Sequence, residues 1–157
     1  MAATTSVGTV AGTTVGISAV LPATYNVAGY TALTFTNIGN IEDGGEHGRE
    51  YAEVTFNPID TRGTQKFKGS FNEGNKTLSI GYNSDDAGMV LVKAALTSDN
   101  DYAFKVAYPN GDIDFFTAKV MTVTKATGSV DSIIMASVTL AITTNSAGVG
   151  IVEKLST

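Results

Sequence analysis

The chain has 157 residues, and its ten Lys and Arg side chains against fifteen Asp and Glu give a net charge of −5. Because there is no cysteine and only one histidine, disulfides, thiol catalysis and multi-histidine or cysteine-ligated metal centres are excluded. An acidic chain of this kind also lacks the basic surface that gripping nucleic acid requires.

Amino-acid usage favours β structure. Thr (22), Val (15) and Ile (10) far outnumber Leu (7), and β-branched side chains lose rotamer freedom in helices but pack well on a pleated sheet. Charged residues make up 16% of the chain, below the roughly 25% of an average soluble domain. A β protein with so few charges is typical of a surface that partners cover, so we expect a single mainly β domain that assembles with other chains.

Glycine-containing loops separate the strands expected in the first half. The first twelve residues are rich in Ala, Thr and Gly and predict a flexible N-terminal arm, and residues 21–32 predict an uncharged loop. Polar stretches with no apolar periodicity predict mobile loops at 42–50 and 58–64. The strands expected between these segments are 13–20, 33–41 and 51–57.

The middle of the chain predicts a hairpin followed by one helix. Residues 65–71 and 77–82 have the composition of two strands, and the glycine and asparagines of 72–75 suit a turn between them. Apolar positions then recur at helical spacing behind a capping serine and aspartate, which predicts a short helix over 85–96.

The last third predicts long strands. A strand over 101–108 leads into Asn110-Gly111, the strongest hairpin-turn sequence in the chain, and 112–125 and 130–143 follow as two long strands. Residues 132–152 are uncharged and long enough to suggest a membrane span, but their alternation of apolar and polar side chains favours a half-buried strand. Two strands this long exceed what a small sandwich needs and suggest that they line a shared barrel.

Few side chains are placed for catalysis or metal binding. The acids of the 42–50 loop could hold a hard cation, but they lack the ligand spacing of a calcium loop, which favours a solvated loop. His47 has no nucleophile or second acid indicated beside it, and Asp112 with Asp114 are typical of a charged strand end next to a turn. We therefore expect a protein that is not an enzyme and that has no metal site and no cofactor.

Lysines on one expected strand raise the question of nucleic-acid binding. Lys66 and Lys68 share a strand face and Arg62 lies nearby, but a nucleic-acid site needs more positive charge and stackable aromatic rings. An intersubunit ion pair, or protection of an edge strand against aggregation, explains these residues better.

Several motifs occur in the order found in one protein family. They are KGSFNEGNKTL at 68–78, DDAG at 85–88, YAF at 102–104, YPNG at 108–111, FFTAKVM at 115–121, SVDSI at 129–133 and SVTL at 137–140. Upstream, IGNI at 38–41 and VTF at 54–56 also fit. Over residues 30–145 the chain resembles the tail tube (major tail) proteins of lambda-like siphophages.

The resemblance implies a β-sandwich, barrel-like tail tube fold with one short flanking helix. It also implies hexameric rings that stack into a hollow tube through which DNA passes without specific binding. Its partners would be other copies of itself and the tape measure, tail-tip and terminator proteins, with no membrane. The chain would be assembled in the host bacterial cytoplasm and located in the virion. Since it stops at Thr157, we expect no C-terminal immunoglobulin-like domain of the kind some lambda-type tube proteins carry.

Residue roles follow from this resemblance combined with the period-two alternation of a closed barrel. The polar set of three expected strands is assigned to the channel wall: Thr34, Thr36, Glu53, Thr55, Ser137, Thr139 and Thr143. The loops assigned to contacts between rings or subunits contain Glu42, Asp43, Glu46, His47, Arg49, Glu50, Asp60 and Arg62. The two long strands are expected to pair edge to edge with neighbouring copies, through Val120, Thr122, Val138 and Leu140.

Two other readings of the same sequence remain open. One is a monomeric β-sandwich that serves as a binding or adhesion module, and the other is the tube protein of a contractile tail or secretion system, which would share the fold. A hydrolase is disfavoured by the residue inventory.

Overall fold

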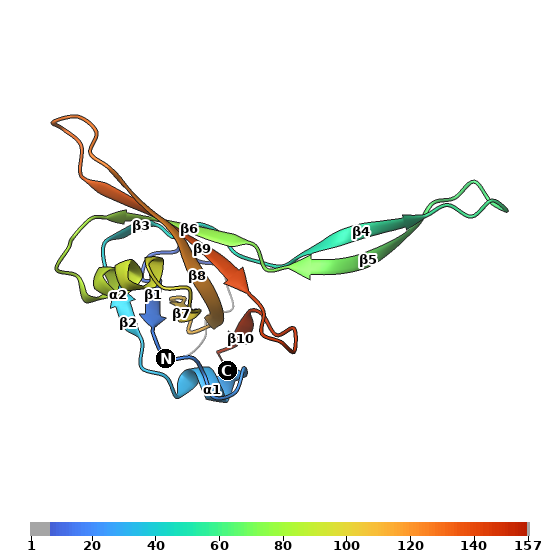
Figure 1. The fold of residues 1–157 in the computed structure, drawn as a ribbon, viewed down its shortest axis with the longest axis horizontal. Coiled ribbons are helices and arrows are strands. Elements are labelled where there is room, and N and C mark those ends of the chain that lie inside the picture. The colour runs from blue at the N-terminus through green and yellow to red at the C-terminus, as the bar shows by residue number, and fades with distance from the viewer. Residues whose placement is uncertain (1–6, 157) are drawn as a thin grey trace.

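A computed structural model describes residues 7–156 as a β-rich body from which a long hairpin projects (Figure 1). The predicted mainly β fold is confirmed. The elements are β1 (Thr14–Ser18), α1 (Val27–Thr31), β2 (Thr36–Ile38), β3 (Ile41–Asp43), β4 (Glu50–Phe56), β5 (Gln65–Asn72), β6 (Asn75–Gly81), α2 (Ala87–Leu96), β7 (Tyr102–Ala107), β8 (Ile113–Ala126), β9 (Met135–Thr143) and β10 (Val152–Lys154).

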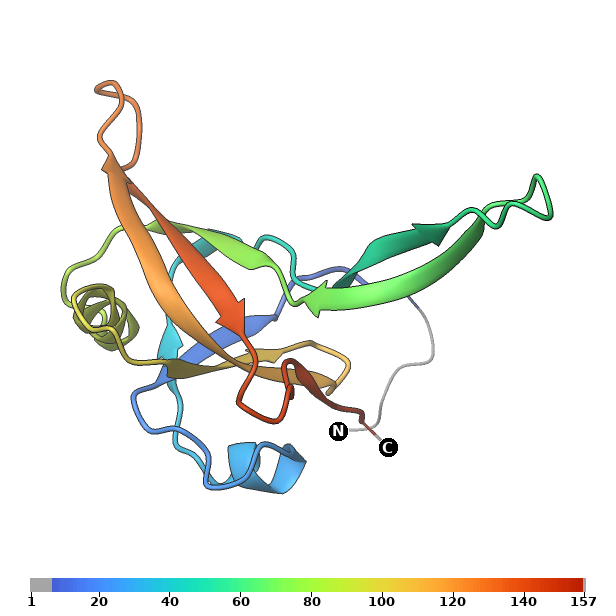
Figure 2. The same ribbon diagram turned by 45° about the vertical axis from the view of Figure 1, so that its right-hand side comes forward.

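The body is one antiparallel sheet that folds into two layers. Its strand order is β2-β1-β7-β8-β9-β6-β3, with β10 pairing to the start of β8, while β4 and β5 form a separate two-stranded sheet. The fourteen-residue β8 pairs with β7 along 113–118 and with β9 along 117–126. It therefore passes from the β1–β7 layer into the β9–β6 layer, as the turned view in Figure 2 shows.

The core lies between these two layers. On β9, the residues Ala136, Val138, Leu140 and Ile142 are buried while those between them are partly exposed. They face the stacked rings of Phe104 and Phe116 from the other layer, whose centroids are 5.6 Å apart. Each fully buried aliphatic or aromatic side chain contributes about 1.5–3 kcal/mol, so this alternation supplies most of the driving force for folding.

Helix α2 closes one side of the core and confirms the predicted helix, although its cap is the residue after the predicted Ser84 or Asp85. Asp86 caps it, and one carboxylate oxygen accepts hydrogen bonds from the backbone nitrogens of Met89 (3.1 Å) and Gly39 (3.2 Å). Because Gly39 lies between β2 and β3, this single side chain fixes the helix to the edge of both layers. Among residues 7–156, no helix has the length and apolar character of a membrane-spanning segment.

A second helix was not expected, because residues 21–32 predicted only a loop. Asn26 caps α1 by accepting a hydrogen bond from the nitrogen of Gly29 at 2.8 Å. The helix buries Tyr30, whose ring stacks on Phe115 at 5.2 Å on the outer face of the β1–β7–β8 layer. Burial raises the pKa of the Tyr30 hydroxyl to about 12, so it stays neutral and packs as an aromatic group.

The predicted hairpin of 65–71 with 77–82 is wrong. β5 pairs with β4, and β6 pairs with β9 and β3. The turn chemistry is real, since Gly74 has a φ of +84° and its nitrogen donates to the Asn72 side chain. It redirects the chain from one sheet into the other instead of folding it back.

Smaller differences concern strand limits. The predicted strand 33–41 is split into β2 and β3 by Asn40, which has a φ of 62°, and the predicted strand 130–143 starts only at Met135. β10 was not foreseen. Residues 1–6 of the expected N-terminal arm lie outside the described residues, and 7–12 contain no strand or helix.

A glycine inside α2 gives a sharp stability test. Alanine is intrinsically about 1 kcal/mol better than glycine in a helix. At Gly88, however, an added Cβ would lie 2.5 Å from the carbonyl oxygen of Asn37 and 2.6 Å from Cα of Ile38. We expect Gly88→Ala to lower the free energy of unfolding by about 1–3 kcal/mol, as overpacking does, measured by chemical denaturation.

The matched control is Ala94→Gly on the exposed side of the same helix, which should cost about 1 kcal/mol by propensity alone. A Gly88→Ala protein more stable than the wild type would contradict the close packing of α2 on β2.

Candidate functional site

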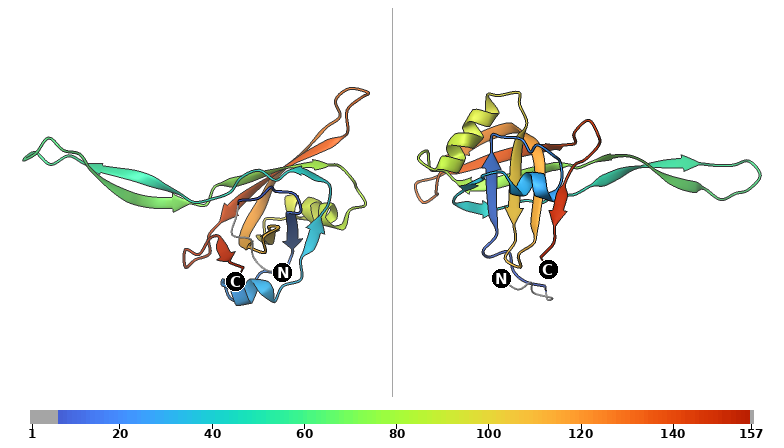
Figure 3. Two further views of the ribbon diagram at one scale, coloured as in Figure 1. Left: turned by 180° about the vertical axis from the view of Figure 1, so that it is seen from behind. Right: turned by 90° about the horizontal axis from the view of Figure 1, so that it is seen from below.

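The most conspicuous surface is the hairpin formed by β4 and β5, which projects away from the body (Figures 1 and 3). Every residue of β4 is exposed, and within residues 7–156 the two strands pair only with each other. An isolated two-stranded hairpin is marginally stable in water at best. Contacts at its root therefore have to supply most of the order of the β4–β5 hairpin in the free chain.

The β4–β5 hairpin has one apolar and one charged face. Val54 pairs with Phe67, and with Phe56 they are 48–56% exposed, which is unusual for three such side chains on one surface. On the opposite face Lys66 lies 3.7 Å from Glu53. An exposed pair of this kind adds little stability, so the charged face suits water and the apolar face suits a partner.

At the root of the hairpin, the loop between β3 and β4 is anchored by His47. Its side chain is 10% exposed, and Nε2 lies 2.7 Å from Oδ2 of Asp114, which also accepts a hydrogen bond from the Tyr108 hydroxyl at 2.7 Å. Nζ of Lys76 lies 3.1 Å from Nδ1 of His47. The loop 42–50, which was predicted to be solvated, is thus held at its centre by His47, whose partners lie on β6, on β8 and just after β7.

This arrangement fixes the proton positions. A lysine ammonium can only donate, so Nδ1 of His47 accepts, and the ring proton on Nε2 is donated to Asp114. Burial lowers the pKa of Lys76, and the charges of Asp114 and Asp43 counteract that shift in part. With both ring nitrogens engaged, His47 has none left to act as a general base.

A second buried charge lies on the other side of the root. Glu73, immediately after β5, is 2% exposed, and Nε of Arg49 donates to its Oε1 at 2.6 Å. The backbone nitrogen of Ile151 donates to its other oxygen at 3.2 Å. Arg49 also covers the Phe71 ring, with its Cζ 3.9 Å from the ring centroid. One carboxylate therefore joins both ends of the hairpin to the segment before β10.

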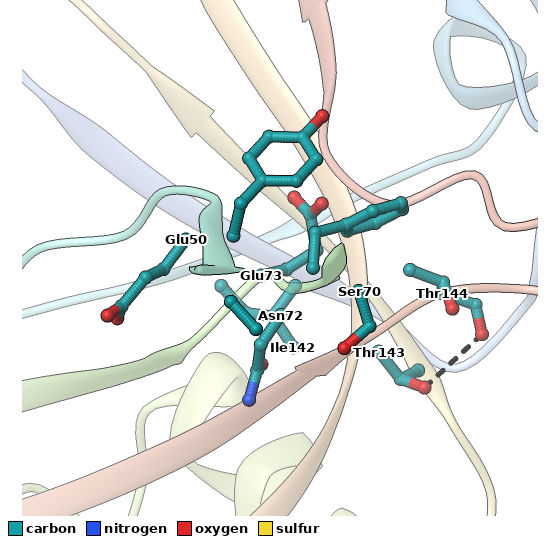
Figure 4. A pocket seen from close by; sticks show the side chains of 10 residues that line it. Glu50, Ser70, Asn72, Glu73, Ile142, Thr143 and Thr144 are labelled. Carbon is teal, nitrogen blue, oxygen red and sulfur yellow. Dashed lines mark hydrogen bonds between the residues drawn. The ribbon is translucent and has the colours of Figure 1, made fainter. Parts of the chain in front are cut away.

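An open groove of 510 Å³ runs beside this root, between the start of the hairpin and the end of β9 (Figure 4). Its lining includes Glu50, Asn72, Glu73, Thr143 and Thr144.

In the described part of the chain, no group of three or more His, Asp or Glu side chains is placed to hold a metal ion.

A face of hydroxyl groups covers the outside of the β8–β9–β6 layer. In register, Ser137 of β9 lies between Ser79 and Thr124, and Thr139 lies between Thr77 and Thr122. We call these six residues the hydroxyl face. They occupy the strand positions that alternate with the core residues, and none carries a charge.

The seven residues predicted for the channel wall do not share one surface. Ser137, Thr139 and Thr143 lie on the partly exposed side of β9. Glu53 and Thr55 lie on the charged face of the β4–β5 hairpin, Thr36 lies on β2, and Thr34 precedes that strand. The single chain therefore separates them into three places, and only the β9 residues belong to the hydroxyl face or its edge.

The expected edge pairing also needs correction. β9 pairs with β6 on one side and β8 on the other along 135–141, so it has no free edge, and Val138 and Leu140 are fully buried in the core. Val120 is 5% exposed, whereas Thr122 lies on the surface. The free edge belongs to the second half of β8, beyond Ala118, where pairing with β7 has ended.

The predicted contact loops are largely on the surface. Their exposed members are Glu42, Asp43, Glu46, Arg49, Glu50, Asp60 and Arg62. His47 is the exception, because it points into the body.

Comparison with known proteins identifies the family. A family model described as "Lambda phage tail tube protein, TTP" matches residues 23–148. The chain belongs to the lambda phage tail tube protein family. Members of this family are structural proteins of the phage tail.

Solved structures show the same fold at low identity. One is the sheath/tube terminator of an extracellular contractile injection system (PVC) in its extended state, with a TM-score of 0.65, 10% identity, and coverage of 96% of this chain and 98% of that one. Another comes from the sixfold-symmetrised baseplate of the anti-feeding prophage, with a TM-score of 0.62, 8% identity, and coverage of 87% and 92%. No curated protein sequence matches this tail tube chain.

The buried cluster gives the tail tube chain a defined response to acid. Burial of Asp114 raises its pKa, but hydrogen bonds from His47 and Tyr108 and the charge of Lys76 lower it to a net value below the ordinary 3.8. A carboxylate with a lowered pKa stabilises the fold above its unfolded-state pKa and loses that contribution as the pH falls through its folded-state pKa.

We therefore expect Asp114→Asn to cost about 1–3 kcal/mol of unfolding free energy at neutral pH. The gap to the wild type should shrink as the pH falls below 3.8. Denaturant titrations at a series of pH values measure the difference in unfolding free energy, with the exposed Asp131→Asn variant as the control. A gap that stays constant with pH would show that the Asp114 charge is not what the cluster binds.

Proposed function

We propose that this protein self-assembles into hexameric rings, which stack into the hollow tube of a phage tail through which DNA is delivered. The observation that carries the proposal is the β4–β5 hairpin of a tail tube family member, whose apolar face is left uncovered by the described residues of its own chain. Another copy of the same chain is a partner that is present wherever this protein is made. The contact would be head to tail, because the hairpin of one copy would bind a different surface of the next copy.

Strand edges support chain-to-chain pairing. The layer β8–β9–β6–β3 ends on one side at the second half of β8 and on the other at β3, and each of these edges is paired on one side alone. Unpaired edges favour addition of another strand. Joining the β8 edge of one copy to the β3 edge of the next would close the layers into one continuous barrel.

The hydroxyl face supports an inner wall. If the β8–β9–β6–β3 layers close into a barrel in this way, with the core side of each layer facing away from the channel, the six residues of the hydroxyl face of each copy would line the channel. Hydroxyl groups keep such a wall hydrated, and without positive charge they offer no anchor for DNA phosphates. This revises the wall predicted from the sequence, since Glu53 is replaced by uncharged residues of β6 and β8.

The remaining roles follow from the proposed tube. The tube would be built in the host bacterial cytoplasm and carried in the virion, with tape measure, tail-tip and terminator proteins at its ends and in its lumen. One fold neighbour comes from an extracellular contractile injection system and another from the baseplate of the anti-feeding prophage. The tube of a contractile tail or secretion system is therefore the alternative assembly for the same surfaces. A monomeric binding module is the opposite outcome of the assembly test.

Assembly can be tested on the hairpin itself. We expect Phe67→Asp to abolish tubes and rings in negative-stain micrographs while circular dichroism stays that of the wild type, because it places a charge in the apolar face. The matched control, Thr55→Asp on the opposite face, should still assemble. A wild-type chain that remains monomeric at high concentration would overturn the proposal.

The channel wall can be tested with a positive charge. Tubes of Thr139→Lys should bind or retard double-stranded DNA, and the effect should weaken steeply as salt is raised, because phosphate contacts release counterions. Thr55→Lys on the β4–β5 hairpin is the control and should leave DNA retention unchanged. Equal retention by both variants would mean that the hydroxyl face does not line the channel.

A further inference from the structure

The root of the β4–β5 hairpin contains more buried polar groups than any other part of the described surface layer. Glu73 is 2% and Lys76 3% exposed, and the His47 side chain is 10% exposed. Buried charges are costly unless they are paired, and each of these groups has a partner from a different segment of the chain. Such a concentration where a projecting element joins the body needs a structural reason.

Glu73 connects three segments. Its Oε1 binds Arg49 in front of β4, its own backbone follows β5, and its Oε2 binds the nitrogen of Ile151 before β10. The segment before β10 packs against it without spare room, because a Cβ added at Gly150 would lie 2.4 Å from Cδ of Glu73. A swing of the hairpin would break one of these bonds and leave one buried carboxylate oxygen without its partner.

The opposite side of the root is fixed independently. His47 binds Asp114 of β8 and Lys76 of β6, so the loop that leads into β4 is attached to two strands of the body. In the same loop Gly45 has a φ of +65°, and a Cβ there would lie 2.1 Å from the carbonyl oxygen of Thr77. Both chain segments of the hairpin are therefore held at the point where they leave the body.

We propose that Glu73, with Arg49 and the segment before β10, acts as a clamp that sets the direction of the β4–β5 hairpin in the free chain, so that each copy is ready for its neighbour before assembly. This inference rests on the proposed self-assembly. A hairpin without contacts to the body would otherwise sample many directions, and the entropy of ordering it would oppose every subunit addition. Glu73 is thus a positioning residue for ring formation.

Because the chain has no cysteine, two spin labels can be placed without background. The pair Thr61→Cys, in the loop at the tip of the hairpin, and Ala94→Cys, on the exposed side of α2, reports the direction of the hairpin by double electron–electron resonance below the assembly concentration. We expect one narrow distance distribution. Glu73→Gln should broaden it and raise the critical concentration for tube formation about tenfold or more, as a loss of preorganisation does.

The matched control is Glu53→Gln, which removes the same charge from the exposed face of the hairpin. It should leave the distance distribution and the critical concentration unchanged. Arg49→Gln is a second variant with less risk of misfolding, since Arg49 is 36% exposed and the bond from Ile151 to Glu73 stays in place. It should broaden the distribution in the same direction.

The outcomes separate the clamp from the assembly proposal. A narrow distribution in both Glu73→Gln and Arg49→Gln overturns the clamp, even if assembly weakens. A broad distribution with an unchanged critical concentration also overturns it, and leaves the proposed tube intact. Failure of the unlabelled wild-type chain to assemble overturns both, whereas broadening together with weaker assembly, against an unchanged Glu53→Gln control, supports the clamp.

Discussion

The fold depends on one strand that serves both layers of the sheet. Phe116 and Val120 are four residues apart on β8, yet Phe116 pairs with Phe104 of one layer and Val120 with Leu140 of the other. Both side chains face the same core. A register shift between Val120 and Thr122 lies where the strand leaves the first layer, and bulges of this kind increase local twist. Without that passage the two layers would not be parts of one hydrogen-bonded sheet.

The same period-two alternation that fills the core also produces the hydroxyl face. Along β9, residues 136, 138, 140 and 142 are buried, so 137 and 139 must point the other way. Their neighbours on β6 and β8 are hydroxyl residues too, in register. The hydroxyl face itself therefore carries no charge, and Lys119, which lies opposite Ala141 on the same side of the layer, is paired with Asp101. A surface of this composition suits the inner wall of the proposed tube, because water wets it and it offers no unpaired cation to phosphates.

The sequence predicted those elements that depend on residues close together in the chain. The alternation of 136–143 and the capped apolar periodicity of α2 were readable, because each depends on residues a few positions apart. Strand pairing was not, since the turn at Gly74 looks the same whether the next strand folds back or joins another sheet. The burial of Glu73 was equally invisible: it lies between Asn72 and Gly74 like any turn residue, and its partner Ile151 is 78 positions away. His47 was identified as the only imidazole, but its partners lie on β6, on β8 and just after β7, segments that the sequence could not bring together.

The choice of charged groups at the hairpin root has a physical logic. Apolar side chains at the root would contribute more stability than buried ions, because burying ions costs desolvation free energy. Apolar contacts are non-directional, however, and would allow the hairpin to rotate about its root. A carboxylate that accepts one bond from Arg49 and another from Ile151 is satisfied in a single geometry. In the proposed ring, angular accuracy matters because head-to-tail contacts close into a ring only if every copy turns by the same angle, and otherwise grow into an open helix. The two bonds to Glu73 cost some stability relative to an apolar root, but they define the direction of the hairpin, which is what closure of the proposed ring requires.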